Sequence, residues 1–123
     1  MELRSEQIHQ TLRQLKRKTE QQEDELYAIR QRQIQLEDTE TELRHIEQRE
    51  KENLIAQAHD VWRGNHGKSV AFHAEETAHE SWRKLRRHIE NTREQLKQKQ
   101  KTIQSSLSQM EEERKLLHKE LVL

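Results

Sequence analysis

Histidine and glutamate are the residues of this chain whose number and spacing could support metal binding or proton transfer. Eight histidines are present, and Glu-x-x-His pairs occur in both halves of the chain, among them Glu42 with His45 and Glu76 with His79. A di-metal carboxylate site in a helical bundle needs two such pairs and two further glutamates, all projecting inward. If the chain folds back near its midpoint, the two pairs are offset by about 13 Å along the helices. We therefore interpret the histidines as surface residues and expect no metal and no cofactor.

Other catalytic chemistry lacks the residues or the scaffold that it requires. The chain has no cysteine, which excludes a thiol nucleophile and a thiolate metal site. It has no glycine-rich phosphate loop, and nothing in the pattern predicts a concave fold that could enclose a substrate. We expect that the protein is not an enzyme.

Two long helices are the elements that must position any functional residue. Both glycines lie in the hexapeptide Trp62-Arg63-Gly64-Asn65-His66-Gly67, and the chain has no proline. Glycine after a run of helix formers favours the left-handed conformation that ends a helix. The sequence predicts a single domain over residues 1–123, with a helix over about 3–61, a turn over about 62–69 and a helix over about 70–121.

Apolar residues recur every seven positions in both arms, which predicts an all-α fold, an antiparallel two-helix coiled-coil hairpin. We use the word seam for the rows through which the arms would pack. One row of the first arm contains Ile8, Leu15, Ile29, Leu36 and Leu43, interrupted by Gln22. The other row contains Leu12, Leu26, Leu54 and Val61, interrupted by Thr19, Gln33, Glu40 and Glu47. The predicted seam of the second arm contains Phe72, Trp82, Leu85, Ile89, Leu96, Ile103, Met110 and Leu117.

Several apolar residues fall outside this seam. They are Ile34, Ile46, Ile55, Leu107 and Leu116. A two-helix hairpin with so thin a seam is marginal alone, because most helix stability in proteins comes from tertiary burial. We expect these residues to contact another helical pair, in a homo- or hetero-oligomer that resembles a four-helix bundle.

Composition excludes several kinds of partner. The 23 basic residues balance the 23 acidic ones, whereas a nucleic-acid interface needs clustered excess positive charge. No apolar stretch is long enough to span a membrane, and the N-terminal residues do not resemble a cleavable signal peptide. We expect a cytoplasmic protein, or one exported without such a peptide.

The triplet Trp62-Arg63-Gly64 reads W-x-G at the predicted turn, with Ala71 and Phe72 following it. This pattern resembles the WxG-motif small proteins of type VII secretion systems, and most closely the longer YwqH-like family that accompanies LXG-domain toxins. The family has a spaced A-x-x-F after the motif, whereas Ala71 and Phe72 are adjacent here.

The resemblance implies a non-catalytic partner protein. It would bind the helical LXG region of a toxin, or a related WxG protein, and support its export. Short WxG proteins often carry a Tyr-x-x-x-Asp/Glu export signal after the second helix, whereas the only tyrosine of this chain is Tyr27 in the first arm. The export signal would then come from a partner, or the protein is not itself exported.

Two other functions fit a helical hairpin. One is a coiled-coil stalk or scaffold of a secretion or flagellar ATPase complex, which has no particular need for W-x-G at its bend. The other is an adaptor that binds anionic surfaces through Arg83, Lys84, Arg86 and Arg87, against which the zero net charge counts. On physical grounds alone, the Trp62 indole would plug the end of the hairpin against the second helix, and Gly64 would turn the chain.

Overall fold

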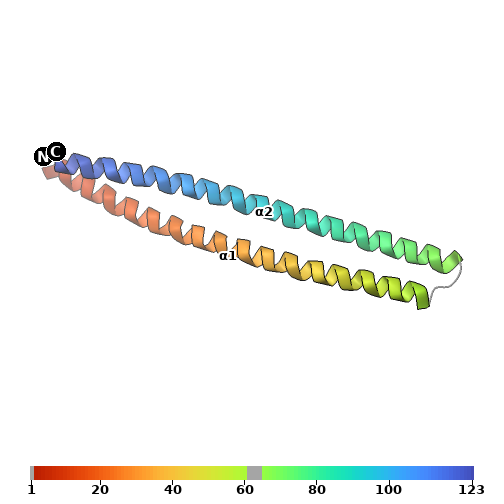
Figure 1. Cartoon of the computed structure of the whole chain (residues 1–123). Coiled ribbons are helices and arrows are strands. Elements are labelled where there is room, and N and C mark those ends of the chain that lie inside the picture. The colour runs from red at the N-terminus through yellow and green to blue at the C-terminus, as the bar shows by residue number, and fades with distance from the viewer. Residues whose placement is uncertain (1, 61–64) are drawn as a thin grey trace. The chain divides into compact units, whose positions relative to one another are not determined.

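The chain forms an all-α helical hairpin, as the heptad pattern predicts. The computed structural model describes residues 2–60 and 65–123, and the side chains of these residues other than 57–60, 65–67 and 71. Helix α1 is Glu2–Asp60 and helix α2 is Asn65–Val122 (Figure 1). No residue within the two described ranges forms a strand. The absence of proline leaves both helices free of an interior break.

The second helix begins earlier than the sequence predicts. Helix α2 starts at Asn65 rather than near residue 70, so Gly67, predicted in the turn, lies inside a helix. A glycine costs a helix only about 0.5–1 kcal/mol relative to alanine, and the long run of residues that follows offsets this cost. Trp62 and Gly64 lie outside the described residues, as does the expected packing of the Trp62 indole.

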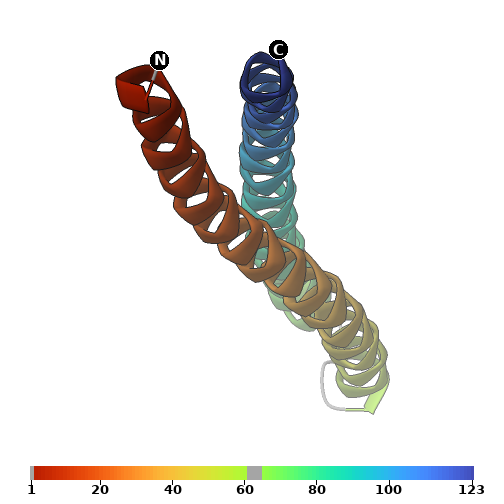
Figure 2. The ribbon, with the colours of Figure 1, turned by 90° about the vertical axis from the view of Figure 1, so that its left-hand side faces the viewer.

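The chain divides into two compact units, each an antiparallel pair of helix segments. Unit 1 pairs residues 2–33 of α1 with residues 95–122 of α2. Its core is apolar and consists of the side chains of Ile8, Leu15, Leu26, Ile29, Leu96 and Met110. Arg4 and Glu120 form an ion pair of 2.9 Å that joins the two helix ends facing the viewer in Figure 2.

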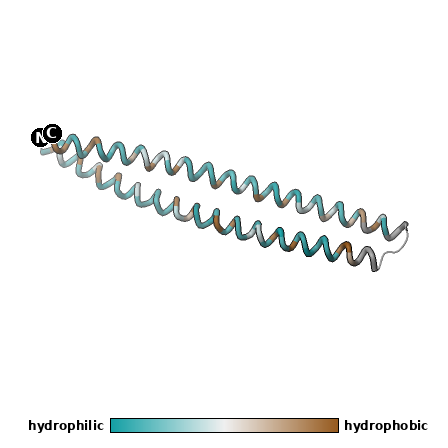
Figure 3. The backbone as a smooth tube through the Cα atoms, in the orientation of Figure 1, coloured by the Kyte–Doolittle hydropathy of each residue, from teal (hydrophilic) through white to brown (hydrophobic). Residues whose placement is uncertain are grey.

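Unit 2 comprises residues 34–94 and has a different interior. Among its described side chains, Ile89 is the one apolar residue that is buried, and Glu47 is buried as well. In Figure 3, hydrophobic positions recur singly along helices that are otherwise hydrophilic. Unit 2 therefore relies more on polar contacts than unit 1 does.

Candidate functional site

Exposed apolar side chains of unit 2 are the candidate site. Ile34, Ile46 and Ile55 of α1 are 53%, 48% and 59% exposed. Each side chain leaves water only if something outside the described hairpin covers it. Burying an isoleucine fully is worth about 1.5–3 kcal/mol, and because about half of each side chain is already covered, a partner would gain about half of that from each.

These three isoleucines flank the seam on both sides. The seam row of α1 in this region steps through Gln33, Glu40, Glu47 and Leu54. Ile34 and Ile55 each follow a residue of that row directly, whereas Ile46 precedes one. Because successive residues of a helix are separated by about 100°, Ile46 lies on the opposite side of the seam from the other two.

A hollow of about 320 Å³ lies beside Ile46 on α1. Leu54 lines it together with Arg49, Glu50 and Asn53. The apolar side chains of Ile46 and Leu54, with polar residues around them, form a surface against which a side chain of a partner helix would pack. The exposed face near Ile46 therefore has a shallow depression on α1.

The two other predicted partner contacts differ from each other. Leu116 of α2 is exposed, but Leu107 is half-buried in unit 1. Leu107 belongs to the α2 row that contains Arg86, Arg93 and Gln100, all of which contact α1. Leu107 is therefore less available to a partner than Leu116, and its contact with a partner stays a prediction.

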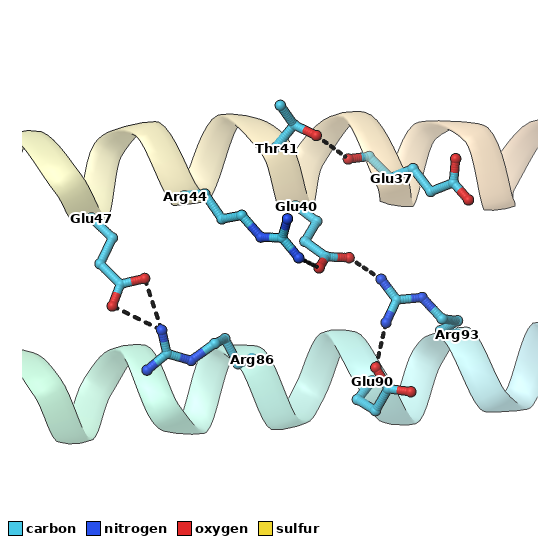
Figure 4. A network of polar contacts seen from close by, with 8 residues as sticks. All are labelled: Glu37, Glu40, Thr41, Arg44, Glu47, Arg86, Glu90 and Arg93. Carbon is cyan, nitrogen blue, oxygen red and sulfur yellow. Dashed lines mark hydrogen bonds and ion pairs between the residues drawn. The ribbon is translucent and has the colours of Figure 1, made fainter.

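Polar residues occupy the seam of unit 2 in place of apolar ones. The Arg86 Nη1 donates to both oxygens of the Glu47 carboxylate, at 2.8 and 2.9 Å. Glu40 accepts hydrogen bonds from Arg44 of its own helix and from Arg93 of α2, which also contacts Glu90 (Figure 4). The residues that interrupt the apolar row of α1 therefore bind partners across the helix pair.

The predicted seam residues of α2 differ in how deeply they are buried. Ile89, Leu96 and Met110 are buried, and Trp82, Leu85, Ile103 and Leu117 are half-buried. Trp82 also donates from Nε1 to the Glu50 carboxylate of α1 at 3.2 Å. Phe72 is 58% exposed, so its predicted place in the seam is corrected. It lies before the strict seven-residue series begins at Trp82.

The polar partners on α2 are what the sequence analysis missed. Gln33, Glu40 and Glu47 recur every seven residues on α1, and they contact Gln100, Arg93 and Arg86, which also recur every seven residues. A search for polar heptad rows of matching spacing on both arms would have found them. Apolar stripes alone do not reveal these polar pairs.

Other residue clusters are weaker candidates for a binding site. Within the basic run of α2, Arg86 pairs with Glu47 and Lys84 lies 3.9 Å from the Glu80 carboxylate. This leaves fewer cations for an anionic surface. In the part of the chain that the structure describes, no three His, Asp or Glu side chains are grouped so that they could hold a metal ion. No helix within that part has the length and apolarity to cross a membrane.

Comparisons with known proteins add no relative. No family model matches the chain, and no curated protein or solved structure matches it either.

Proposed function

We propose that this chain is a non-catalytic helical partner protein of a type VII secretion system, which binds the helical LXG region of a toxin, or a related WxG protein, and supports its export. The observation that carries the proposal is the exposure of Ile34, Ile46 and Ile55 in a unit with almost no apolar core. The W-x-G triplet at positions 62–64 supports the choice of secretion system.

The partner that fits these isoleucines is another helical pair with apolar stripes, because one helix cannot cover both sides of the seam. Exposed apolar residues on both sides of a two-helix seam correspond to the surfaces that further helices cover in a bundle. The hollow beside Ile46 and Leu54 would accept a side chain of such a helix. Apolar residues at helical spacing on the partner are the usual complement in helix-to-helix recognition.

Polar pairing inside unit 2 is consistent with this function. Ion pairs at the surface contribute little stability, and the buried apolar area of unit 2 is small. A partner helical pair that buried the exposed isoleucines would therefore supply stabilisation that the hairpin lacks on its own.

Co-purification from the native host tests the proposal. A tagged chain should retain a protein with an LXG-type helical region, identified by mass spectrometry. The double variant Ile34→Glu/Ile46→Glu should weaken binding at least about tenfold, since covering the exposed halves of two isoleucines contributes about 1.5–3 kcal/mol. Its helical content, measured by circular dichroism, should stay near that of the unmodified chain.

A matched control separates loss of apolar contact from added charge. Gln31→Glu/Gln35→Glu adds the same charge at two exposed positions of α1 and should leave binding unchanged. Recovery of rotary-ATPase subunits would favour the stalk function instead. Equal binding by the isoleucine double variant would show that these residues do not form the interface.

A further inference from the structure

A second surface lies in unit 1, where a groove of about 570 Å³ runs between the two helices of the pair. Leu12, Leu15 and Met110 give it an apolar floor. Leu15 and Met110 are buried in the core of unit 1, and Leu12 is half-buried. The groove thus lies directly above part of the apolar core of unit 1.

Charged residues of α1 line this groove in an ordered sequence. Arg13 and Lys16 come first along the helix, and Glu20 and Glu23 follow. All four are exposed. None of them makes a hydrogen bond or an ion pair with any other residue in the described part of the chain. The basic end and the acidic end therefore both remain available.

The α2 side of the groove contributes no comparable free charge. Arg114 and Glu111 both line it, and they pair with each other at 2.6 Å. Their charges largely cancel locally. The field along the groove is consequently set by the four charged residues of α1.

The four residues are spaced symmetrically about position 18. Arg13 and Lys16 are three apart, Glu20 and Glu23 are three apart, and four positions separate the inner two. Reversing the helix about position 18 exchanges Arg13 with Glu23 and Lys16 with Glu20. Every cation then occupies the place of an anion.

We propose that this groove binds the same groove of a second copy of the chain, with the two α1 helices antiparallel. In that arrangement Arg13 of each copy meets Glu23 of the other, and Lys16 meets Glu20, giving four intermolecular ion pairs. The apolar floors of Leu12, Leu15 and Met110 face each other below them. A two-fold interface of this kind needs a self-complementary patch, and the charge order supplies it.

The charge order selects against other occupants. A parallel pairing of two α1 helices would place like charges together, which is unfavourable. An anionic ligand would meet two glutamates at one end of the groove, and a cationic one would meet two basic residues at the other. The second copy is the occupant that satisfies both ends.

Sedimentation velocity and equilibrium test this interface. The unmodified chain should form a dimer that dissociates more readily as salt rises from about 50 mM to about 500 mM, because exposed ion pairs are screened. Arg13→Glu/Lys16→Glu and Glu20→Lys/Glu23→Lys should each weaken self-association at least about tenfold, since each loses four ion pairs and gains repulsion. An equimolar mixture of the two double variants should form a heterodimer, and the variant carrying all four changes should dimerise again.

Three results would overturn the proposal. They are a monomer at all concentrations of the unmodified chain, double variants that dimerise as it does, or a mixture of the two double variants that does not associate. Circular dichroism of each variant monitors folding, and association of the mixture independently shows that both variants fold. Ile34→Glu/Ile46→Glu should keep the dimer, so failure of this interface is distinguishable from failure of the partner proposed above.

Discussion

Arg86 of α2 donates from a single guanidinium nitrogen to both carboxylate oxygens of Glu47 on α1, at 2.8 and 2.9 Å. Glu47 is only 8% exposed, whereas the Arg86 side chain is half-exposed. Lys51, one turn further along α1, lies 3.7 Å from the same carboxylate. A buried charge is thus compensated mainly by one residue of the opposite helix.

Arg86→Ala should lower the free energy of unfolding by about 1–3 kcal/mol, because a buried carboxylate would lose its cross-helix donor. Urea denaturation followed by circular dichroism measures the change. Arg87→Ala removes a neighbouring exposed arginine and should change stability by no more than about 0.5 kcal/mol. Equal effects of the two substitutions would contradict the assignment of Arg86 as the principal partner of Glu47.

The double variant Glu47→Leu/Arg86→Leu should recover the stability that Arg86→Ala loses, or exceed that of the unmodified chain. Replacing a buried ion pair by apolar residues is often neutral or stabilising. The pair would then fix the register of α1 against α2 more than it stabilises the fold. A change of oligomeric state or a broader unfolding transition in the double variant would reveal this role.

Gln22→Leu should raise the free energy of unfolding by about 1–3 kcal/mol. The side-chain oxygen Oε1 of Gln22 is buried without a hydrogen-bond partner among the described residues. Leucine would continue the row of Leu15 and Ile29 at that position. Thermal unfolding checks this, with the exposed Gln21→Leu as control, and a fall in stability would show that Oε1 has a donor in solution.

The Arg4 side chain lowers the pKa of the Glu120 carboxyl through a hydrogen bond and an ion pair. Likewise, the hydrogen bond from Arg114 lowers the pKa of Glu111. Because both folded-state pKa values are depressed, the stability from these pairs is present above the ordinary glutamate pKa. It is lost as pH falls through the lowered values.

Carbon-13 NMR of the glutamate carboxyls should therefore show Glu120 and Glu111 titrating below the other exposed glutamates. Arg4→Ala should return the Glu120 pKa to its ordinary value and leave that of Glu111 unchanged. If both shifted together, long-range charge rather than the direct Arg4 contact would be the cause.

Local periodicity was sufficient to predict the two helices and most of their packing rows. Ile8, Leu15, Ile89 and Leu96 lie in the predicted rows and are buried, because a seven-residue repeat of apolar side chains places them on one helix face. The hairpin followed from the confinement of both glycines to one hexapeptide. The start of α2 could not be predicted from the glycines, because a single glycine such as Gly67 costs a helix too little to fix where it begins.

Tertiary structure alone decided which polar residues bind one another. Glu40 and Glu47 were visible in the sequence as interruptions of an apolar row, but their pairing with Arg93 and Arg86 depends on the register of α1 against α2. Register is a non-local property, because residues about 40 to 50 positions apart must meet, and a helical repeat on one arm does not specify its partner on the other. For the same reason, the sequence alone did not show that Leu107 is half-buried in unit 1.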